Sequence, residues 1–321
     1  MDLSRAVQNK STPPHQPVLL NEVVEYLSIK DGGRYLDCTF GAGGYTRAIL
    51  SSCNCYVTAL DQDPTVINFA NDVSRDYGNR FNFIQTNFSK AASKLNGKKF
   101  DGIVLDLGIS SMQVDQSARG FSFMQDGPLD MRMSATGMSA AEFLETASQQ
   151  EIADIIYKYG EEVQSRAIAK NIVFYRQTDC IDTTLKLAEI VRQSKHYRQE
   201  KIDPATKTFQ AIRIYINDEL GALEQFLANA EDLLVPSGRI VVVSFHSLED
   251  SIVKNFFKEC SVKKIAKSKY SKEPDSLPQG KWLRIITKKP VSPSRGEVQK
   301  NSRSRSAKLR VAEKIGGNNV T

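Results

Sequence analysis

A glycine-rich loop lies between a predicted buried strand and a predicted helix, in the segment Asp37-Cys-Thr-Phe-Gly-Ala-Gly-Gly-Tyr45. The apolar-rich run Arg34-Tyr-Leu precedes it, and Thr46-Arg-Ala-Ile-Leu50 follows with the composition of a first helical turn. Glycines in such a loop let the backbone approach a ligand closely, and the N–H groups of the helix point at that ligand. This context predicts a pocket for a nucleotide-type cofactor, with an ordinary tight turn as the alternative.

The residue types in the loop favour S-adenosylmethionine (SAM) over other nucleotide cofactors. A dinucleotide-binding loop places glycine at its first, third and sixth positions. Gly41 and Gly43 fill the first two, but the sixth is Thr46. No Lys-Ser or Lys-Thr pair follows, which excludes a P-loop. Asp37 before the loop suits the ammonium group of SAM. A dinucleotide-dependent oxidoreductase is the disfavoured alternative.

Three acidic residues end predicted strands of this region. Asp37 and Asp61 follow the first two apolar runs, and Asp106 follows the fourth. Ligands of open parallel sheets bind beyond the carboxyl ends of the strands, so we expect the three carboxylates at one rim. Asp61 can accept hydrogen bonds from both ribose hydroxyls of a cofactor. The alternative for Asp61 is a helix cap before Pro64.

The order of predicted elements indicates an α/β fold. Strand patterns alternate with helical ones such as 64–73, which is typical of a doubly wound, Rossmann-like parallel sheet. From Ser139 to about Lys195 the pattern is only helical, with Gly160 as an expected helix break. We therefore expect a SAM-binding core in two parts (1–114 and 205–321) around an inserted all-helical domain (115–204) that caps the cofactor. The expected strands are 34–38, 55–60, 81–85, 102–107, 239–245, 282–287 and 307–312, and the expected insert helices are 151–159, 161–176 and 183–193.

Composition excludes several classes of protein. No apolar run is long enough to cross a bilayer, and the first residues lack the apolar core of a signal peptide, so we expect a cytoplasmic protein without a membrane partner. The five cysteines show no paired spacing of metal ligands, and no metal site is predicted.

Positive charge is concentrated toward the C-terminal part. Residues 262–310 hold fifteen Lys or Arg and three acids, a net charge of +12, whereas the whole chain carries +6. The segment Ser302-Arg-Ser-Arg-Ser306 adds hydroxyls beside arginines, a combination suited to phosphate contacts. This asymmetry predicts a nucleic-acid surface. A solvated basic loop around 263–279 is the alternative.

Several motifs together resemble one family, the bacterial methyltransferases that modify N4 of a cytosine in the decoding centre of 16S ribosomal RNA. The resemblance runs from about His15 to Lys314. It is carried by the glycine loop and by His15-Gln-Pro-Val-Leu-Leu20, Asp106-Leu-Gly-Ile-Ser-Ser111, Arg119-Gly-Phe-Ser-Phe-Met124, Asp126-Gly-Pro-Leu-Asp-Met-Arg-Met133, Ser244-Phe-His-Ser-Leu-Glu-Asp250 and Ser302-Arg-Ser-Arg-Ser-Ala-Lys-Leu-Arg310.

The resemblance implies SAM as cofactor and 16S rRNA as partner, within a small ribosomal subunit, and it allows a homodimer. Tyr45 and Ser251 depart from the His and Arg that are common at those positions in the family. The SAM contacts implied by the family fall on Gly43, Gly44, Tyr45, Asp61, Phe88, Asp106 and Gln113.

Two residues are candidates for the chemistry. The amine of cytosine is a poor nucleophile, so an acceptor should bind its N–H and hold it in line with the methyl group. Asp106 is the leading acceptor, and His246 is a weaker candidate for contacting the base or receiving a proton. Phe121 and Phe123 could stack on an unstacked base and Arg132 could bind a phosphate, with core packing as the alternative for the two aromatics. A ribosome-assembly factor without catalysis is the remaining alternative.

Overall fold

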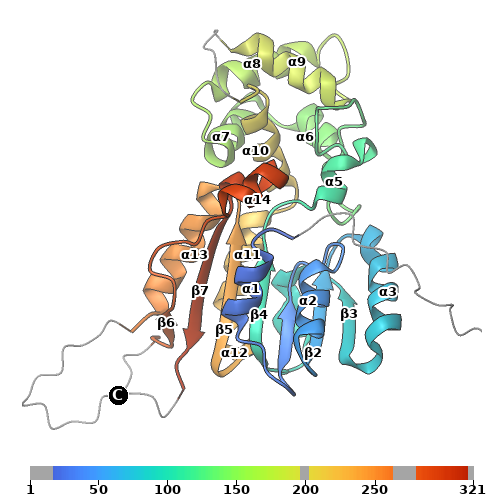
Figure 1. Cartoon of the computed structure of the whole chain (residues 1–321). Helices are drawn as coiled ribbons and strands as arrows, with labels where there is room; N and C mark the ends of the chain where they lie inside the picture. Colours follow the sequence, from blue (N-terminus) through green and yellow to red (C-terminus); the bar gives the residue numbers. More distant parts are fainter. Residues whose placement is uncertain (1–16, 196–201, 263–279, 317–321) are drawn as a thin grey trace, which may run out of the picture.

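The computed structural model describes residues 17–195, 202–262 and 280–316, and it divides into a sheet domain and a helical domain above it (Figure 1). The sheet has the order β3-β2-β1-β4-β5-β7-β6. Its first five strands pair in parallel, and β7 runs antiparallel to both β5 and β6. The strands are β1 (Arg34–Asp37), β2 (Tyr56–Asp61), β3 (Phe81–Gln85), β4 (Phe100–Asp106), β5 (Leu234–Ser244), β6 (Leu283–Ile285) and β7 (Lys308–Lys314).

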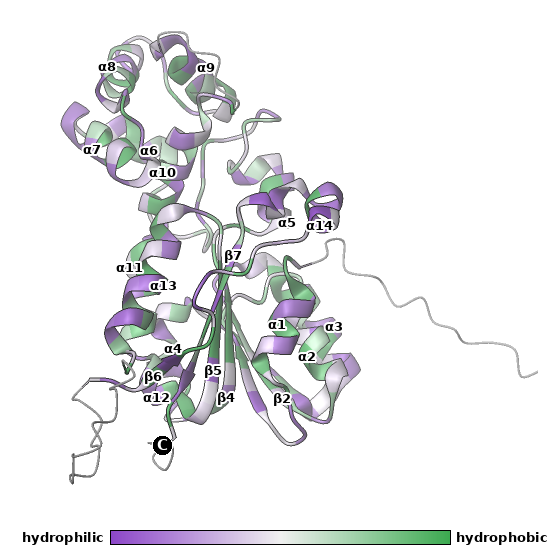
Figure 2. Cartoon of the chain, turned by 60° about the vertical axis from the view of Figure 1, so that its left-hand side comes forward, coloured by the Kyte–Doolittle hydropathy of each residue, from purple (hydrophilic) through white to green (hydrophobic). Residues whose placement is uncertain are grey.

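Helices cover both faces of this sheet, as Figure 2 shows with the strands seen nearly edge-on. Successive strand residues point to opposite faces, so β4 places Val104 in one apolar cluster and Ile103 and Leu105 in the other. The doubly wound α/β fold predicted from the sequence is confirmed. One face packs on α1 (Leu20–Leu27), α2 (Gly44–Ser52) and α3 (Ile67–Tyr77), and the other on α4 (Ala91–Lys94), α11 (Glu219–Ala228), α12 (Ala230–Leu233) and α13 (Ser247–Cys260).

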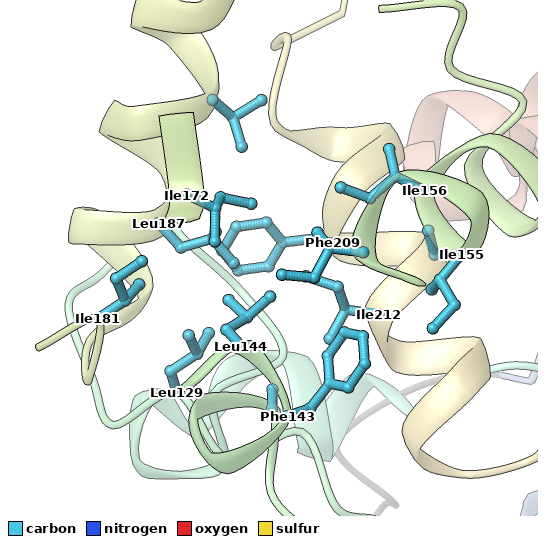
Figure 3. Packing of buried hydrophobic residues seen from close by; sticks show 14 of the residues in the cluster. Leu129, Phe143, Leu144, Ile155, Ile156, Ile172, Ile181, Leu187, Phe209 and Ile212 are labelled. Atoms are coloured by element: carbon cyan, nitrogen blue, oxygen red, sulfur yellow. The ribbon is translucent and has the colours of Figure 1, made fainter. Parts of the chain in front are cut away.

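The helical insert has an apolar core of its own (Figure 3). In that core, Phe209 and Ile212 of α10 pack among residues of the other insert helices. The expected boundary between 204 and 205 is therefore wrong, because the apolar face of α10 belongs to the insert, and the chain returns to the core only after Ile216. The insert helices are α6 (Ala140–Thr146), α7 (Gln149–Gly160), α8 (Ser165–Tyr175), α9 (Thr184–Ser194) and α10 (Thr206–Ile216).

The helix break expected at Gly160 is confirmed. Gly160 is the last residue of α7, and the helix ends because Glu161 adopts a left-handed conformation with φ of 50°. A Cβ atom on Gly160 would lie 2.5 Å from the carbonyl oxygen of Lys207 in α10. Glycine is therefore needed here for close approach of two helices, and the expected helix 161–176 begins only at Ser165.

The strand predicted at 239–245 is longer than expected. β5 begins at Leu234 and includes Pro236-Ser-Gly238, residues of types that are common in turns. Its pairing with β4 shifts register between Phe100 and Gly102, and Ser237 has a φ of 62°. An irregularity of this kind accommodates proline in a strand. The strand therefore begins five residues before the predicted start at Arg239.

No helix in the three described ranges combines the length and the apolar composition needed to cross a membrane. Residues 263–279 of the basic region lie outside the described residues, as do His15 and Gln16 of the first motif.

Candidate active site

A cavity of about 560 Å³ opens at the carboxyl ends of the strands, beneath the insert. Asp37, Asp61 and Asp106 are the last residues of β1, β2 and β4, so the predicted rim of carboxylates is confirmed. β1 and β4 are neighbours whose connections leave in opposite directions, which is the switch point where such sheets bind ligands. Asp61 and Asp106 line the cavity directly, whereas Asp37 lies buried beneath it.

The glycine loop forms one wall of the cavity. Gly41 has a φ of 53°, and a Cβ atom placed on it would meet no atom within 4 Å. Gly43 has a φ of 79° and caps the N-terminus of α2. Left-handed conformations at both positions favour glycine. The space beside the backbone is open for a ligand at Gly41, whereas a Cβ atom on Gly43 would lie 2.9 Å from the ring of Phe40.

The Asp61 carboxylate can accept further hydrogen bonds. Its two oxygens accept the N–H groups of Gly41 at 2.8 Å and Asp63 at 2.9 Å. Burial raises the pKa of Asp61 to about 6, although these two N–H groups oppose the shift. Each carboxylate oxygen can accept a second hydrogen bond, so the group can still bind a pair of ribose hydroxyls.

Asp37 supports the rim from below. Its carboxylate accepts the Thr46 hydroxyl at 2.7 Å and the Thr39 N–H at 3.2 Å. Burial raises its pKa to about 6, against the effect of these hydrogen bonds. Thr46, which departs from the dinucleotide pattern, therefore binds the acid that precedes the loop.

Asp106 is the least satisfied of the three acids. Its Oδ1 atom is buried and has no hydrogen-bond partner among the described residues. Burial, followed by the charges of Asp37 and Glu249, raises its pKa well above the ordinary value. A buried acceptor without a donor is costly to the free protein, so a bound N–H group would be stabilised at this position.

Gly44, Tyr45, Phe88 and Gln113 also line the cavity as predicted, whereas Gly43 is not among the lining residues. Phe88 packs edge-on against Phe226 with its ring centroid 5.9 Å away. Tyr45 is buried, and its hydroxyl donates to the carbonyl of Val18. The amide of Gln113 is engaged at both ends, since its oxygen accepts the Ser110 N–H and its nitrogen donates to Asp63. Gln113 thus shapes the wall through its packing.

His246 caps helix α13. Its Nδ1 atom accepts the N–H of Glu249 at 3.5 Å, and its Nε2 atom lies 3.1 Å from Oε1 of the same residue. The Glu249 carboxylate in turn accepts the N–H groups of Phe245 and His246. The imidazole therefore caps α13 through Nδ1, whereas Nε2 lies near Glu249 but is buried without a hydrogen bond among the described residues.

His246 belongs to a cluster of possible metal ligands that was not predicted from the sequence. Glu219, His246 and Glu249 offer ligand atoms within 4.8 Å of one another, the spacing of a metal site. Arg213 donates to both oxygens of Glu219, at 2.7 and 3.0 Å, and so supplies a positive charge from the protein itself. Glu219 and the pair His246 and Glu249 come from separate segments, which is why no local sequence pattern revealed the cluster.

The aromatic residues of the Arg119-Gly-Phe-Ser-Phe-Met124 motif do not face the cavity. Phe121 is 7% exposed and belongs to the insert core. Phe123 is partly buried and packs edge-on against Phe209 at 4.8 Å. The expectation that they stack on a base is wrong, because both rings complete the apolar core of the insert. Arg132 is paired with Asp130 at 2.6 Å, which weakens its expected role as a phosphate ligand.

We expect Phe121→Ala to destabilise the insert by about 3–5 kcal/mol, since it removes a buried ring from a closed core. The measurement is the free energy of unfolding by denaturant. Phe174→Ala is the control, because Phe174 lies in the same domain and is 69% exposed. A stability loss no larger than that of the control would show that Phe121 is free for another role.

Some basic residues of the C-terminal motif hold the fold together, and another lies at the cavity. Arg310 is buried and donates to Asp250 of α13 at 2.6 Å, and Lys308 joins the same carboxylate at 3.2 Å. Arg303 lines the cavity mouth and pairs with Asp115 at 2.6 Å. Charge that the sequence assigned to nucleic-acid binding therefore serves partly to hold β7 against α13.

Comparison with known proteins identifies relatives of this chain. The model of the MraW methylase family matches residues 12–315. Proteins named ribosomal RNA small subunit methyltransferase H are 64% identical in Rickettsia massiliae (strain Mtu5) and 63% identical in Rickettsia rickettsii (strain Sheila Smith), over 94% of this chain and 98% of each relative. A solved rRNA methylase from Streptococcus thermophilus has 11% identity and a TM-score of 0.39 over 92% of this chain and 93% of its own. The family match spans the glycine loop, the strand-end carboxylates and the insert, and the chain belongs to the MraW methylase family.

Proposed function

We propose that this protein transfers the methyl group of SAM to N4 of a cytosine in the decoding centre of 16S rRNA. Family membership and the high identity to relatives named for methylation of small-subunit rRNA support the reaction class. The observation that carries the chemical assignment is the buried, unpartnered Oδ1 of Asp106 at the cavity. Cytosine N4 carries the N–H donors that such an acceptor requires.

The residues of the cavity fit the cofactor. Open space at Gly41 allows the backbone of the loop to approach the methionine part, beside Gly43 and Gly44. Asp61 would accept the ribose hydroxyls, and Phe88 would flank the adenine. Bound in this way, SAM supplies an electrophilic methyl group. The acidic lining suits its positive sulfonium, because opposite charges attract strongly in a partly buried site.

Asp106 acts on the base. An unstacked cytosine enters the cavity, and the Asp106 carboxylate accepts an N–H of its amine, which orients the nitrogen lone pair. As the nitrogen attacks, it becomes positively charged, and the carboxylate stabilises that charge. Burial raises the pKa of Asp106 in the free protein, and a positive charge bound in the same cavity would lower that pKa and so favour the ionised carboxylate. We keep His246 as part of the wall, fixed by Glu249.

The proposed setting is an assembled small ribosomal subunit in the cytoplasm. The cavity lining comes from one chain, so a homodimer would carry two such cavities. The test compares methyl transfer from labelled SAM to three substrates: subunits lacking the modification, subunits already modified, and naked 16S rRNA. Label only on the unmodified subunits supports the proposal. Equal label on naked RNA would contradict the assembled subunit as substrate, and no label on any would contradict the function.

We expect the affinity for SAM to fall as the pH drops through about 6. Asp61 has a pKa of about 6, and only its ionised form can accept both ribose hydroxyls, so protonation removes that contact. Asp37 titrates in the same range and adds to the effect. The dissociation constant should rise roughly tenfold for each pH unit below 6 per titrating group. Calorimetry between pH 5 and 8 measures this, and Asp61→Asn should make the profile shallower.

A further inference from the structure

One arginine joins the cofactor rim to the insert. The Arg119 guanidinium donates through Nη1 to Oδ2 of Asp63 at 2.8 Å. Through Nη2 it donates to the carbonyls of Arg132 at 2.9 Å and Met133 at 3.0 Å. The Arg119 side chain is only 14% exposed, so these hydrogen bonds are shielded from water. A single planar group thus holds two segments that are about seventy residues apart in the sequence.

On the core side, the partner of Arg119 is fixed to the cofactor site. Asp63 lies two residues beyond Asp61, and its N–H donates to the Asp61 carboxylate at 2.9 Å. Its own carboxylate also accepts hydrogen bonds from Thr65 and from Gln113. Burial alone would raise the pKa of Asp63, but these hydrogen bonds and that of Arg119 lower it below the ordinary value. Asp63 is therefore a charged, rigid anchor next to the residue expected to bind the ribose.

On the insert side, Arg119 holds a segment that forms part of the cavity wall. Met133 lines the cavity, and its sulfur accepts the Gln62 amide at 3.2 Å. Its N–H donates to the Asn217 side chain at 2.7 Å, and the same side chain donates to the Met131 carbonyl at 2.7 Å. Asn217 follows α10 directly. The segment 131–133 is therefore held between the cofactor rim and the end of the helix that returns to the core.

We propose that Arg119 is a positioning residue that couples occupancy of the cofactor site to the orientation of the insert, so that SAM and RNA each bind more tightly when the other is present. The insert has an apolar core of its own, and its polar contacts with the sheet domain include Arg119 with Asp63 and Glu161 with Ser247. The angle of the insert to the sheet depends on polar contacts such as those of Arg119. A ligand that orders Asp61 and Asp63 stabilises this bridge and with it the position of the insert over the cavity.

The inference concerns the methyltransferase reaction as a whole and holds whichever group accepts the amine proton. A comparison of Arg119→Lys with wild type distinguishes the effect of the shape of the guanidinium from the effect of its charge. Lysine carries the same charge but has no planar fork, so it cannot span the Asp63 carboxylate and two carbonyl oxygens together. If the role of Arg119 were only to neutralise Asp63, Arg119→Lys would retain it.

The experiment measures the dissociation constant of SAM with and without small ribosomal subunits lacking the modification, together with kcat and KM, for wild type, Arg119→Gln and Arg119→Lys. Arg176→Gln is the matched control. Arg176 also donates to two main-chain carbonyls of the insert, those of Leu144 and Ala147, and it contributes nothing to the cavity lining. Thermal unfolding shows whether each variant is folded. If Arg119→Gln does not fold, Arg119→Lys serves as the test.

In wild type we expect SAM to bind about five- to tenfold more tightly in the presence of subunits. In both Arg119 variants that ratio should fall to about one, and kcat should fall roughly 10- to 100-fold because the base is misplaced relative to the methyl group. The control should behave as wild type. An unchanged ratio in Arg119→Gln, full recovery in Arg119→Lys, or equal SAM affinity with and without subunits in wild type would each overturn the inference.

Discussion

Replacing Asp106 by asparagine is expected to lower kcat by about 100- to 1,000-fold, the effect of removing one preorganised electrostatic contact from a transition state. Asparagine keeps the size of the side chain and an acceptor oxygen, but it removes the negative charge that stabilises the amine as it becomes positive. The buried Oδ1 without a partner marks this carboxylate as the group whose hydrogen bond is completed by the substrate.

The affinity for RNA should fall much less than kcat in Asp106→Asn. Single-turnover methyl transfer gives the chemical step, and the retention of subunits by the variant gives RNA affinity. Asp115→Asn is a suitable control, because Asp115 is half exposed, pairs with Arg303 and is not among the residues that line the cavity. Equal losses of RNA binding and of turnover in Asp106→Asn would refute the catalytic assignment.

Replacing Asp61 by alanine is expected to weaken SAM binding by about 10- to 100-fold, with little effect on kcat at saturating SAM. The change removes hydrogen bonds between a charged acceptor and the ribose hydroxyls, and such bonds contribute about 1.5–3 kcal/mol. It also leaves the N–H groups of Gly41 and Asp63 without their acceptor, which loosens the loop.

The dissociation constant measured by calorimetry checks this expectation. Asp101→Ala is the control, because Asp101 lies on β4 at the opposite end of the strand from Asp106 and pairs with Lys30. An Asp61→Ala protein that binds SAM as wild type does would remove this residue from the cofactor site.

Features set by local sequence were predictable. The strands that end in Asp37, Asp61 and Asp106 followed from short apolar runs between glycine and acidic residues, and their common rim followed from the parallel order. Family resemblance then pointed to Phe88 and Gln113, which contribute to the cavity lining although their spacing carries no signal of its own.

Features set by packing between distant segments were not predictable. Phe121 and Phe123 stand in a motif with Arg119, and nothing local shows that two of the three side chains point into the insert core and the third to Asp63. α10 belongs to the insert because of the face it buries, which its periodicity does not assign to either domain. Arg310 likewise becomes structural only when β7 meets Asp250.

The most direct test of the central claim is the position of the transferred methyl group. Small ribosomal subunits that lack the modification are incubated with this protein and methyl-labelled SAM, and fragments of their RNA are analysed by mass spectrometry. The account predicts a single labelled nucleoside, N4-methylcytosine, in a fragment of the decoding centre. Label on another atom or another nucleotide, or binding of SAM without any transfer, would contradict it.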